Sequence, residues 1–194
     1  MHDPFFPAID RIRYQGPDGD EPLAFRWYDA DRDPRVVFLP YLSGERTPHN
    51  DPDATGVFFG LTHATTRADL TRAVLEGVAC ALADGQAALQ AAGARIDRLS
   101  VSGGGARSRF WGRLLASALG RPLTYHAGGE YGPAFGAARL ARLAVTGEAP
   151  DAVCTPPPVE DVMEPDAELQ ERYAARLRIY RQLYRSLRTS FHEL

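Results

Sequence analysis

Apolar and polar residues occur along the chain in blocks that predict strands followed by helices from about residue 36 onward. Short apolar runs bounded by turn residues, which are typical of strands, occupy residues 36–42, 99–101 and 123–127, and residues 56–61 form a short strand or a turn. Apolar residues recur at helical spacing over residues 66–93, 108–118, 133–143 and 166–191. Strands that alternate with helices predict an α/β domain in which neighbouring strands run parallel.

The helix predicted over residues 66–93 has recognisable ends and one apolar face. Thr66 and Asp69 have the spacing of a capping box, and Gly93 suits the C-cap. We expect small residues to allow close packing, and larger ones to form the buried face. The small residues are Gly77, Ala81 and Gly85, and the larger ones are Leu70, Val74, Val78, Leu82 and Leu89.

Three regions follow from these patterns. Residues 1–34 are rich in Pro, Gly and Asp and predict an arm, and residues 35–150 hold the α/β pattern. Residues 151–194 combine the end of a proline-rich linker (residues 149–165) with a long C-terminal helix that begins at Asp166. We interpret the apolar stripe of that helix as packing surface. Its residues are Leu169, Tyr173, Leu177, Tyr180, Leu183, Tyr184, Leu187 and Phe191.

A glycine turn between a strand and a helix is the first candidate for chemistry. Gly103, Gly104 and Gly105 follow the strand, and the helix begins near Ser108. Glycines let a ligand approach the main chain and helix starts attract anions, so a nucleotide phosphate or ribose could lie over residues 103–106. A tight turn without a ligand explains the pattern equally well. A P-loop is excluded because all 22 basic residues are arginine, and Glu130 fits a dinucleotide fingerprint only loosely.

Composition narrows the function classes. The apolar fraction of 44% suffices for a core, and a net charge of −3 with scattered arginines argues against a nucleic-acid partner. We expect no transmembrane segment and no signal peptide, and therefore a cytoplasmic protein without a membrane partner. Cys80 and Cys154 are expected as free thiols. The five histidines show no metal-ligand spacing, so we predict no metal ligand.

Four longer motifs carry a family resemblance, which covers residues 36 to about 191. They are FLPYLSGERTPHNDPDATGVFFGLT at residues 38–62, LEGVACALADG at 75–85, SGGGARSRFW at 102–111 and GPAFGAARLA at 132–141. In this order and spacing they resemble the C-terminal domain of xylulokinases, in the FGGY family of carbohydrate kinases. The family's second signature is matched at Gly56, Gly60, Leu61, Asp69, Leu70, Ala73 and Glu76.

The resemblance implies a fold, a ligand and a reaction. The fold is the C-terminal, ATP-binding domain of an actin-like ATPase, which is ribonuclease H-like, here without its first strands. The implied reaction joins the γ-phosphate of ATP to D-xylulose, with Mg accompanying ATP or ADP. The implied nucleotide site comprises Gly103, Gly104, Gly105, Ala106 and Arg107, with Gly132, Pro133 and Gly136 partly walling the adenine pocket.

The same resemblance implies that the catalytic parts of the family are absent from these residues. The family's catalytic aspartate, sugar contacts and phosphate loop lie in its N-terminal half, and no position here matches them, so we assign no catalytic residue. We expect no sugar phosphorylation by this chain alone, an exposed sheet edge and a bare core face. The alternative is a non-catalytic nucleotide-binding or assembly module, which could complement a separate N-terminal half. The arm at residues 5–32 resembles the N-terminal arm of the larger xylose isomerases, which suggests a remnant of a fusion across adjacent genes.

Five further residues have alternative roles. Glu45 and Arg46 could face a cleft between domains, but we prefer a local ion pair. For Glu76 we prefer a hydrogen bond to backbone over catalysis. Arg107 could bind a phosphate or remain solvated. We expect Trp111 in the core.

His126 also has two alternative roles. It alternates with Tyr125 in a predicted strand, and we interpret it as a strand-end packing residue rather than an acid or base.

Overall fold

The computed structural model describes residues 13–16, 19–22 and 35–194. Contacts divide the chain into two compact units, one that ends at Ala88 and resumes over Ala174–Leu194, and one formed by Leu89–Tyr173. The domain divisions at residues 34 and 150 stay a prediction. Most of the predicted arm lies outside the described residues, and its described part forms a hairpin of β1 (Arg13–Gly16) and β2 (Gly19–Pro22).

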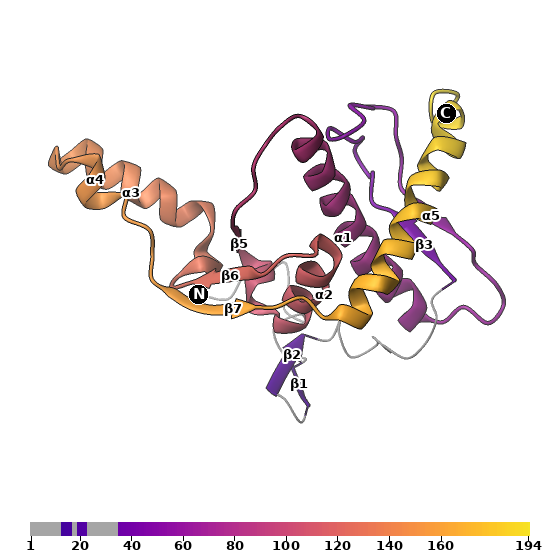
Figure 1. The fold of residues 1–194 in the computed structure, drawn as a ribbon, viewed down its shortest axis with the longest axis horizontal. Coiled ribbons are helices and arrows are strands. Elements are labelled where there is room, and N and C mark those ends of the chain that lie inside the picture. The colour runs from indigo at the N-terminus through magenta and orange to yellow at the C-terminus, as the bar shows by residue number, and fades with distance from the viewer. Residues whose placement is uncertain (1–12, 17–18, 23–34) are drawn as a thin grey trace, which may run out of the picture. The chain divides into compact units, whose positions relative to one another are not determined.

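The core of the first unit forms between a short hairpin and two helices (Figure 1). β3 (Val37–Leu39) pairs antiparallel with β4 (Val57–Phe59), a pairing that the sequence did not predict. β3 supplies Leu39, α1 (Arg67–Ala91) supplies Cys80 and α5 (Ala167–Phe191) supplies Tyr180, all almost fully buried. The apolar stripe predicted for α5 is therefore confirmed as packing surface. Burial raises the pKa of the Cys80 thiol to about 12, so this thiol stays protonated.

The ends of α1 match the prediction, whereas its buried face does not. The Thr66 N–H donates to the Asp69 carboxylate at 2.7 Å and the Asp69 N–H donates to the Thr66 hydroxyl at 3.3 Å, which completes the capping box. Val74, Leu82 and Leu89, however, are exposed. The buried face instead consists of Arg72, Ala73, Glu76, Gly77, Ala79, Cys80, Ala83 and Asp84.

Close approach of two backbones explains this correction. A Cβ at Gly77 would collide with the backbone carbonyl oxygen of Phe38, the middle residue of β3. Only the side of α1 that carries small residues can come this near to β3. Val74, Leu82 and Leu89 are therefore exposed, whereas Leu70 packs against the cluster of Val36, Phe38 and Ala73. Hydrophobicity alone thus predicted the buried face only in part.

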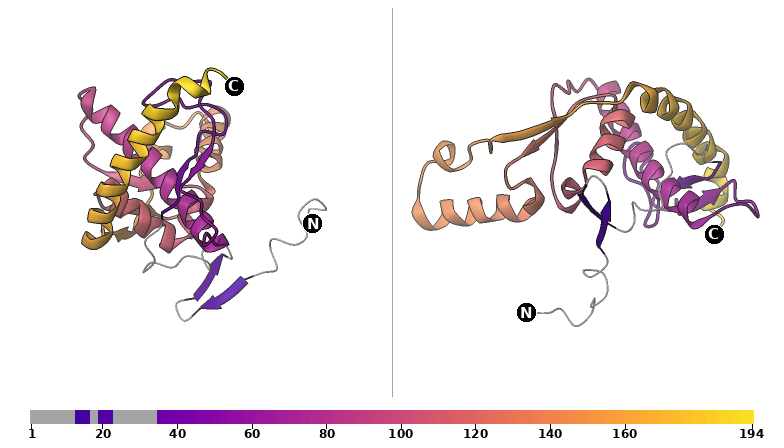
Figure 2. Two further views of the ribbon diagram at one scale, coloured as in Figure 1. Left: turned by 90° about the vertical axis from the view of Figure 1, so that its right-hand side faces the viewer. Right: turned by 90° about the horizontal axis from the view of Figure 1, so that it is seen from below.

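The second unit contains a three-stranded sheet with the order β5, β6, β7, labelled in Figure 1, and Figure 2 gives two further views of the ribbon. β5 (Leu99–Val101) runs parallel to β6 (Leu123–His126), with Leu99 opposite Leu123, as the α/β pattern predicted. β7 (Val159–Met163) pairs antiparallel with β6, although we predicted a linker there. β7 lies at the sheet edge and is mostly exposed, so its sequence has no buried apolar run.

The helices of this unit begin where predicted. α2 (Arg109–Leu119) starts at Ser108, whose hydroxyl accepts a hydrogen bond from the Trp111 N–H at 3.1 Å. Trp111 itself is half-buried rather than a core residue, because Leu114 and Leu115 occupy the buried side of α2. Gly120 ends the helix in the left-handed region, with a φ of 64°.

α3 (Pro133–Thr146) has no buried residue, although most of its residues are apolar. Leu140 is 67% exposed and Val145 is 86% exposed, and the short helix α4 (Pro150–Val153) follows. β5 has a strand partner on one side only. The described residues thus show the exposed sheet edge and the bare apolar face that the sequence predicted.

Two further expectations can be compared with the structure. Both cysteines are free, as expected, with Cys80 buried and Cys154 exposed. Within the described part of the chain, no helix is both long and apolar enough to cross a membrane.

Candidate functional site

The glycine turn after β5 is held against a second turn that precedes α3. The Gly103 N–H donates to the carbonyl oxygen of Gly129 at 2.8 Å. A Cβ at Gly132 would lie 3.1 Å from the Cα of Gly103, so the Gly103 backbone leaves little room for a side chain at Gly132. Gly103 and Gly132 also have φ angles of 85° and 53°, which favour glycine. These two glycines are therefore explained by the fold itself.

Gly104 and Gly136 are different, because the described fold does not require them to be glycine. A Cβ at either position would meet no heavy atom within 4 Å, and both are exposed. Neither has a positive φ. Gly104 begins a 3₁₀ helix (Gly104–Arg107) and Gly136 lies in the first turn of α3. The main chain is thus open to close approach by a ligand at both positions.

The next glycine of the turn lies against an aromatic ring. A Cβ at Gly105 would contact the indole ring of Trp111 at 3.4 Å, which is an ordinary distance. Trp111 thus borders one end of the glycine turn, which accounts for its half-buried position.

A pocket of about 370 Å³ lies beside the same turn, within the second unit. Its volume is in the range of small-ligand sites. Its charged lining residues are Glu130, Glu160 and Arg107, and His126 lines it as well. Two acidic residues and one arginine make the pocket repel an anionic group more than attract one.

His126 is oriented by two hydrogen bonds in this pocket. Its Nδ1 lies 3.0 Å from the carbonyl oxygen of Pro157, and its Nε2 lies 3.1 Å from the Ser100 hydroxyl. A carbonyl oxygen only accepts, so Nδ1 carries the proton and Nε2 of the neutral ring accepts from Ser100. The ring fixes the end of β6 against residues before β7, which agrees with the packing role that we preferred.

Tyr125 lines the pocket through a contact that the sequence did not reveal. A Cβ at Gly112 would collide with the Tyr125 hydroxyl, so the glycine in α2 makes room for this ring. The Arg109 guanidinium lies 4.3 Å from the ring centroid and pairs with Asp161 of β7. Burial raises the pKa of Tyr125, and the adjacent Arg109 guanidinium opposes this shift. Sequence spacing gives no signal for this cluster, because its members come from three elements.

The eight predicted site residues therefore fall into two groups. Ala106 and Arg107 line the pocket, and Arg107 is exposed. The glycines at positions 103, 104, 105, 132 and 136, together with Pro133, lie along the glycine turn and the start of α3. The contact between Gly103 and Gly132 brings the two predicted segments together.

Two predicted residues of the first unit have structural partners. Glu76 is buried and pairs with Arg72 at 2.7 Å and with Arg176 at 3.1 Å, so its partners are guanidinium groups rather than the backbone that we expected. The Glu45 carboxylate accepts a hydrogen bond from the His49 N–H at 2.7 Å. With Arg46 it lines a second cavity of about 350 Å³.

Known proteins resemble this chain over most of its length. The family model for the FGGY family of carbohydrate kinases, C-terminal domain, matches residues 9–145. The xylulose kinase of Escherichia coli strain K12 is 50% identical over 153 residues, which cover 78% of this chain and 32% of that protein. The match to the family begins before residue 34, and the resemblance of the arm to xylose isomerases stays a prediction.

Solved structures of xylulose kinases also resemble this chain. The crystal structure of a xylulose kinase from Brucella ovis matches with a TM-score of 0.73 and 44% identity, over 86% of this chain and 34% of that one. The xylulose kinase from Rhodospirillum rubrum matches with a TM-score of 0.68 and 34% identity, over 87% of this chain and 34% of that one.

The matches cover only part of each relative. The chain spans about a third of the length of the curated relatives that it matches. Its α/β units have the actin-like ATPase fold of FGGY sugar kinases. With a family match over residues 9–145, the chain belongs to the FGGY family of carbohydrate kinases, of which it carries the C-terminal domain.

Proposed function

We propose that this chain binds ATP or ADP at the glycine turn, as the nucleotide-binding part of a xylulose kinase. The open main chain at Gly104 and Gly136 carries this proposal. In this assignment the phosphates lie over residues 103–107, and the adenine ring lies against Gly132, Pro133 and Gly136. Glycines that the fold does not require fit a ligand whose oxygen atoms approach the backbone closely.

Charge supports this placement over the neighbouring pocket. Glu130 and Glu160 both line that pocket and repel a polyphosphate. Arg107, at the end of the glycine turn, is exposed and can turn its guanidinium toward a phosphate. The nucleotide phosphates therefore fit the glycine face, outside the pocket.

Transfer of the γ-phosphate to D-xylulose needs groups beyond those described here. Such a transfer requires a base or an orienting group for the attacking hydroxyl, and a metal ion that neutralises phosphoryl charge. We assign neither a catalytic residue nor an Mg ligand in this chain. We propose that sugar phosphorylation depends on the part of the kinase that lies outside the matched third, and that the reaction takes place in the cytoplasm.

Titration calorimetry with Mg-ADP tests the nucleotide site. We expect saturable binding by the parent chain and at least a ~5-fold loss of affinity in Gly104→Asp, because a one-charge repulsion at about 4 Å costs about 1–4 kcal/mol. Gly136→Ala is expected to weaken binding as well. Gly85→Ala, another helical glycine with room for a Cβ, is the matched control and leaves the affinity unchanged. A folded parent chain that does not bind Mg-ADP would contradict the proposal.

Two structural observations favour the second candidate, an assembly module. β5 is an edge strand and α3 exposes its apolar residues, so both offer surface to another polypeptide. The partner in this reading is a separate N-terminal kinase half. Adding such a half as a separate chain distinguishes the kinase from the non-catalytic assembly module. Restored xylulose-dependent release of ADP supports the kinase. A cooperative thermal melt of the chain alone would argue against an unfolded fusion remnant.

A further inference from the structure

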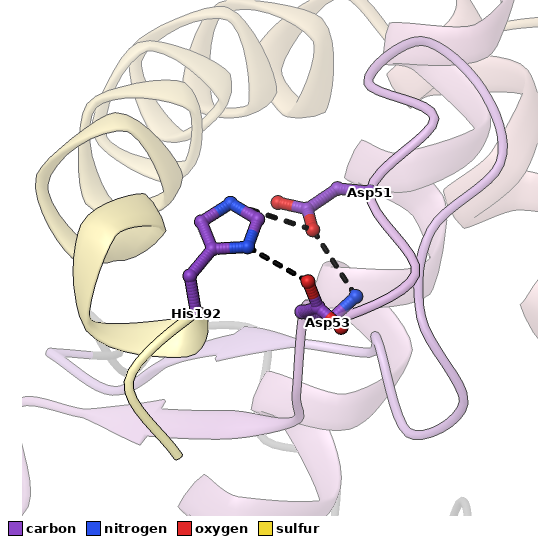
Figure 3. A group of neighbouring side chains, drawn as sticks. All are labelled: Asp51, Asp53 and His192. Atoms are coloured by element: carbon purple, nitrogen blue, oxygen red, sulfur yellow. Dashed lines mark hydrogen bonds and ion pairs between the residues drawn. The ribbon is translucent and has the colours of Figure 1, made fainter.

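A loop and the C-terminal end of α5 bring three potential metal ligands together in the first unit. Figure 3 shows Asp51 and Asp53 on the loop and His192 just beyond α5, with their side chains directed toward one another. The His192 Nδ1 lies 2.8 Å from Oδ2 of Asp53, and its Nε2 lies 4.0 Å from Oδ1 of Asp51. Donor atoms of all three residues lie within 4.8 Å of one another.

Asp51 is the fixed member of this group. Its side chain is only 2% exposed, and its Oδ2 accepts a hydrogen bond from the Tyr184 hydroxyl at 2.7 Å. Backbone hydrogen bonds between Asp51 and Glu45, at 2.7 and 2.8 Å, hold the loop in place. The hydrogen bond from Tyr184 lowers the pKa of Asp51, so the carboxylate is charged at neutral pH. A buried carboxylate oriented by an outer hydrogen bond is the arrangement found behind many metal ligands.

Asp53 and His192 are the movable members. Their side chains are 56% and 45% exposed, which leaves a route for an ion and room for water ligands. Around a zinc ion, donor atoms at about 2.0–2.2 Å from the metal lie roughly 3.3–3.5 Å apart in a tetrahedral site. The Asp53 and His192 atoms must separate slightly, and both must rotate toward Asp51, which their exposure permits.

We propose that Asp51, Asp53 and His192 bind a divalent cation, with zinc as the preferred ion. Two carboxylates balance the charge of one divalent ion, and the imidazole adds a nitrogen ligand. Imidazole nitrogen selects zinc or cobalt over magnesium and calcium, which prefer oxygen ligands. A bound ion would connect the loop to the last residues of α5. This site lies in a different unit from the glycine turn, so the inference does not depend on nucleotide binding.

Cobalt and zinc titrations of the metal-free full chain test the site. A Cys154→Ser background removes the exposed thiol as a competing ligand. We expect one Co²⁺ per chain with a visible absorption band, zinc competition for it, and a higher melting temperature with zinc. Asp53→Asn and His192→Ala are each expected to weaken binding at least 10-fold. His63→Ala removes another exposed histidine and is expected to change nothing.

A purely structural role predicts a different result. If the three side chains form only ion pairs, Asp53→Asn and His192→Ala lower the melting temperature without metal, and the cobalt titration is the same in all variants. That result, or the absence of saturable binding by the folded parent, overturns the proposal. Saturation by calcium or magnesium with no preference for zinc overturns the assignment of the ion.

Discussion

At the scale of single residues, Tyr184 couples α5 to the loop that contains Asp51. Its hydroxyl donates to the Asp51 carboxylate, and its ring stacks on His49 with centroids 3.7 Å apart. Burial and the hydrogen bond to Asp51 raise the pKa of Tyr184 to about 12, while the same bond lowers that of Asp51. The pair therefore consists of a neutral phenol and a charged carboxylate at neutral pH.

Tyr184→Phe is expected to destabilise the protein at pH 7 by about 1–3 kcal/mol, because a buried carboxylate loses its donor. A carboxyl group with a lowered pKa in the folded state stabilises the protein above its unfolded pKa. That contribution is lost as the pH falls through the folded value. The difference between parent and variant should thus shrink below about pH 4. Urea unfolding at a series of pH values measures it, and a difference that persists at low pH would contradict the assignment.

At the scale of elements, helix α1 depends on the absence of a side chain at Gly77. The helix approaches β3 so closely that a Cβ at this position would collide with the Phe38 carbonyl oxygen. The buried charge of Glu76, next in sequence, is balanced by Arg72 and Arg176. Backbone proximity and paired charges thus determine the orientation of α1 together.

The substitution Gly77→Ala should therefore destabilise the protein by about 1–3 kcal/mol, as overpacking does in well-packed cores. Gly85→Ala in the same helix has room for its Cβ, which would lie 3.9 Å from the Thr47 carbonyl oxygen. It should stabilise the helix by up to about 1 kcal/mol. Denaturant unfolding of the two variants gives the comparison, and equal effects would show that helix propensity alone decides.

At the scale of the whole molecule, the proposed nucleotide site does not account for the exposed apolar surface. α3 exposes Phe135, Leu140 and Val145, and β5 has an unpaired edge. Exposed apolar surface and an unpaired strand edge favour association with another chain. We therefore propose that another polypeptide covers α3 and the edge of β5.

Replacing Leu140 and Val145 together by glutamate should reduce self-association of the isolated chain, because two exposed apolar side chains become charged. Sedimentation velocity over a range of concentrations measures the effect. Gln90→Glu, on the exposed part of α1, is a control that adds charge elsewhere and should leave association unchanged. Association that persists in the double variant would show that another surface is responsible.

Much of this molecule could be predicted from sequence because the signals are local. The capping box at Thr66, the N-cap at Ser108 and the stripe of α5 each depend on residues within a few turns of one another. Four motifs in register also predicted the FGGY family. Gly103 and Gly104 look alike in sequence, whereas in the structure only Gly103 has the positive φ that favours glycine.

Tertiary structure alone decided the features that depend on distant residues. The buried face of α1, the strand β7 and the partners of Glu76 were each predicted differently, because packing against β3, pairing with β6 and contact with α5 outweigh local pattern. His192 lies 139 residues after Asp53, so no spacing rule could place them together. Sequence determined the family and most of the elements, since these depend on local pattern. The fold determined which residues share a site, since that depends on distance in space.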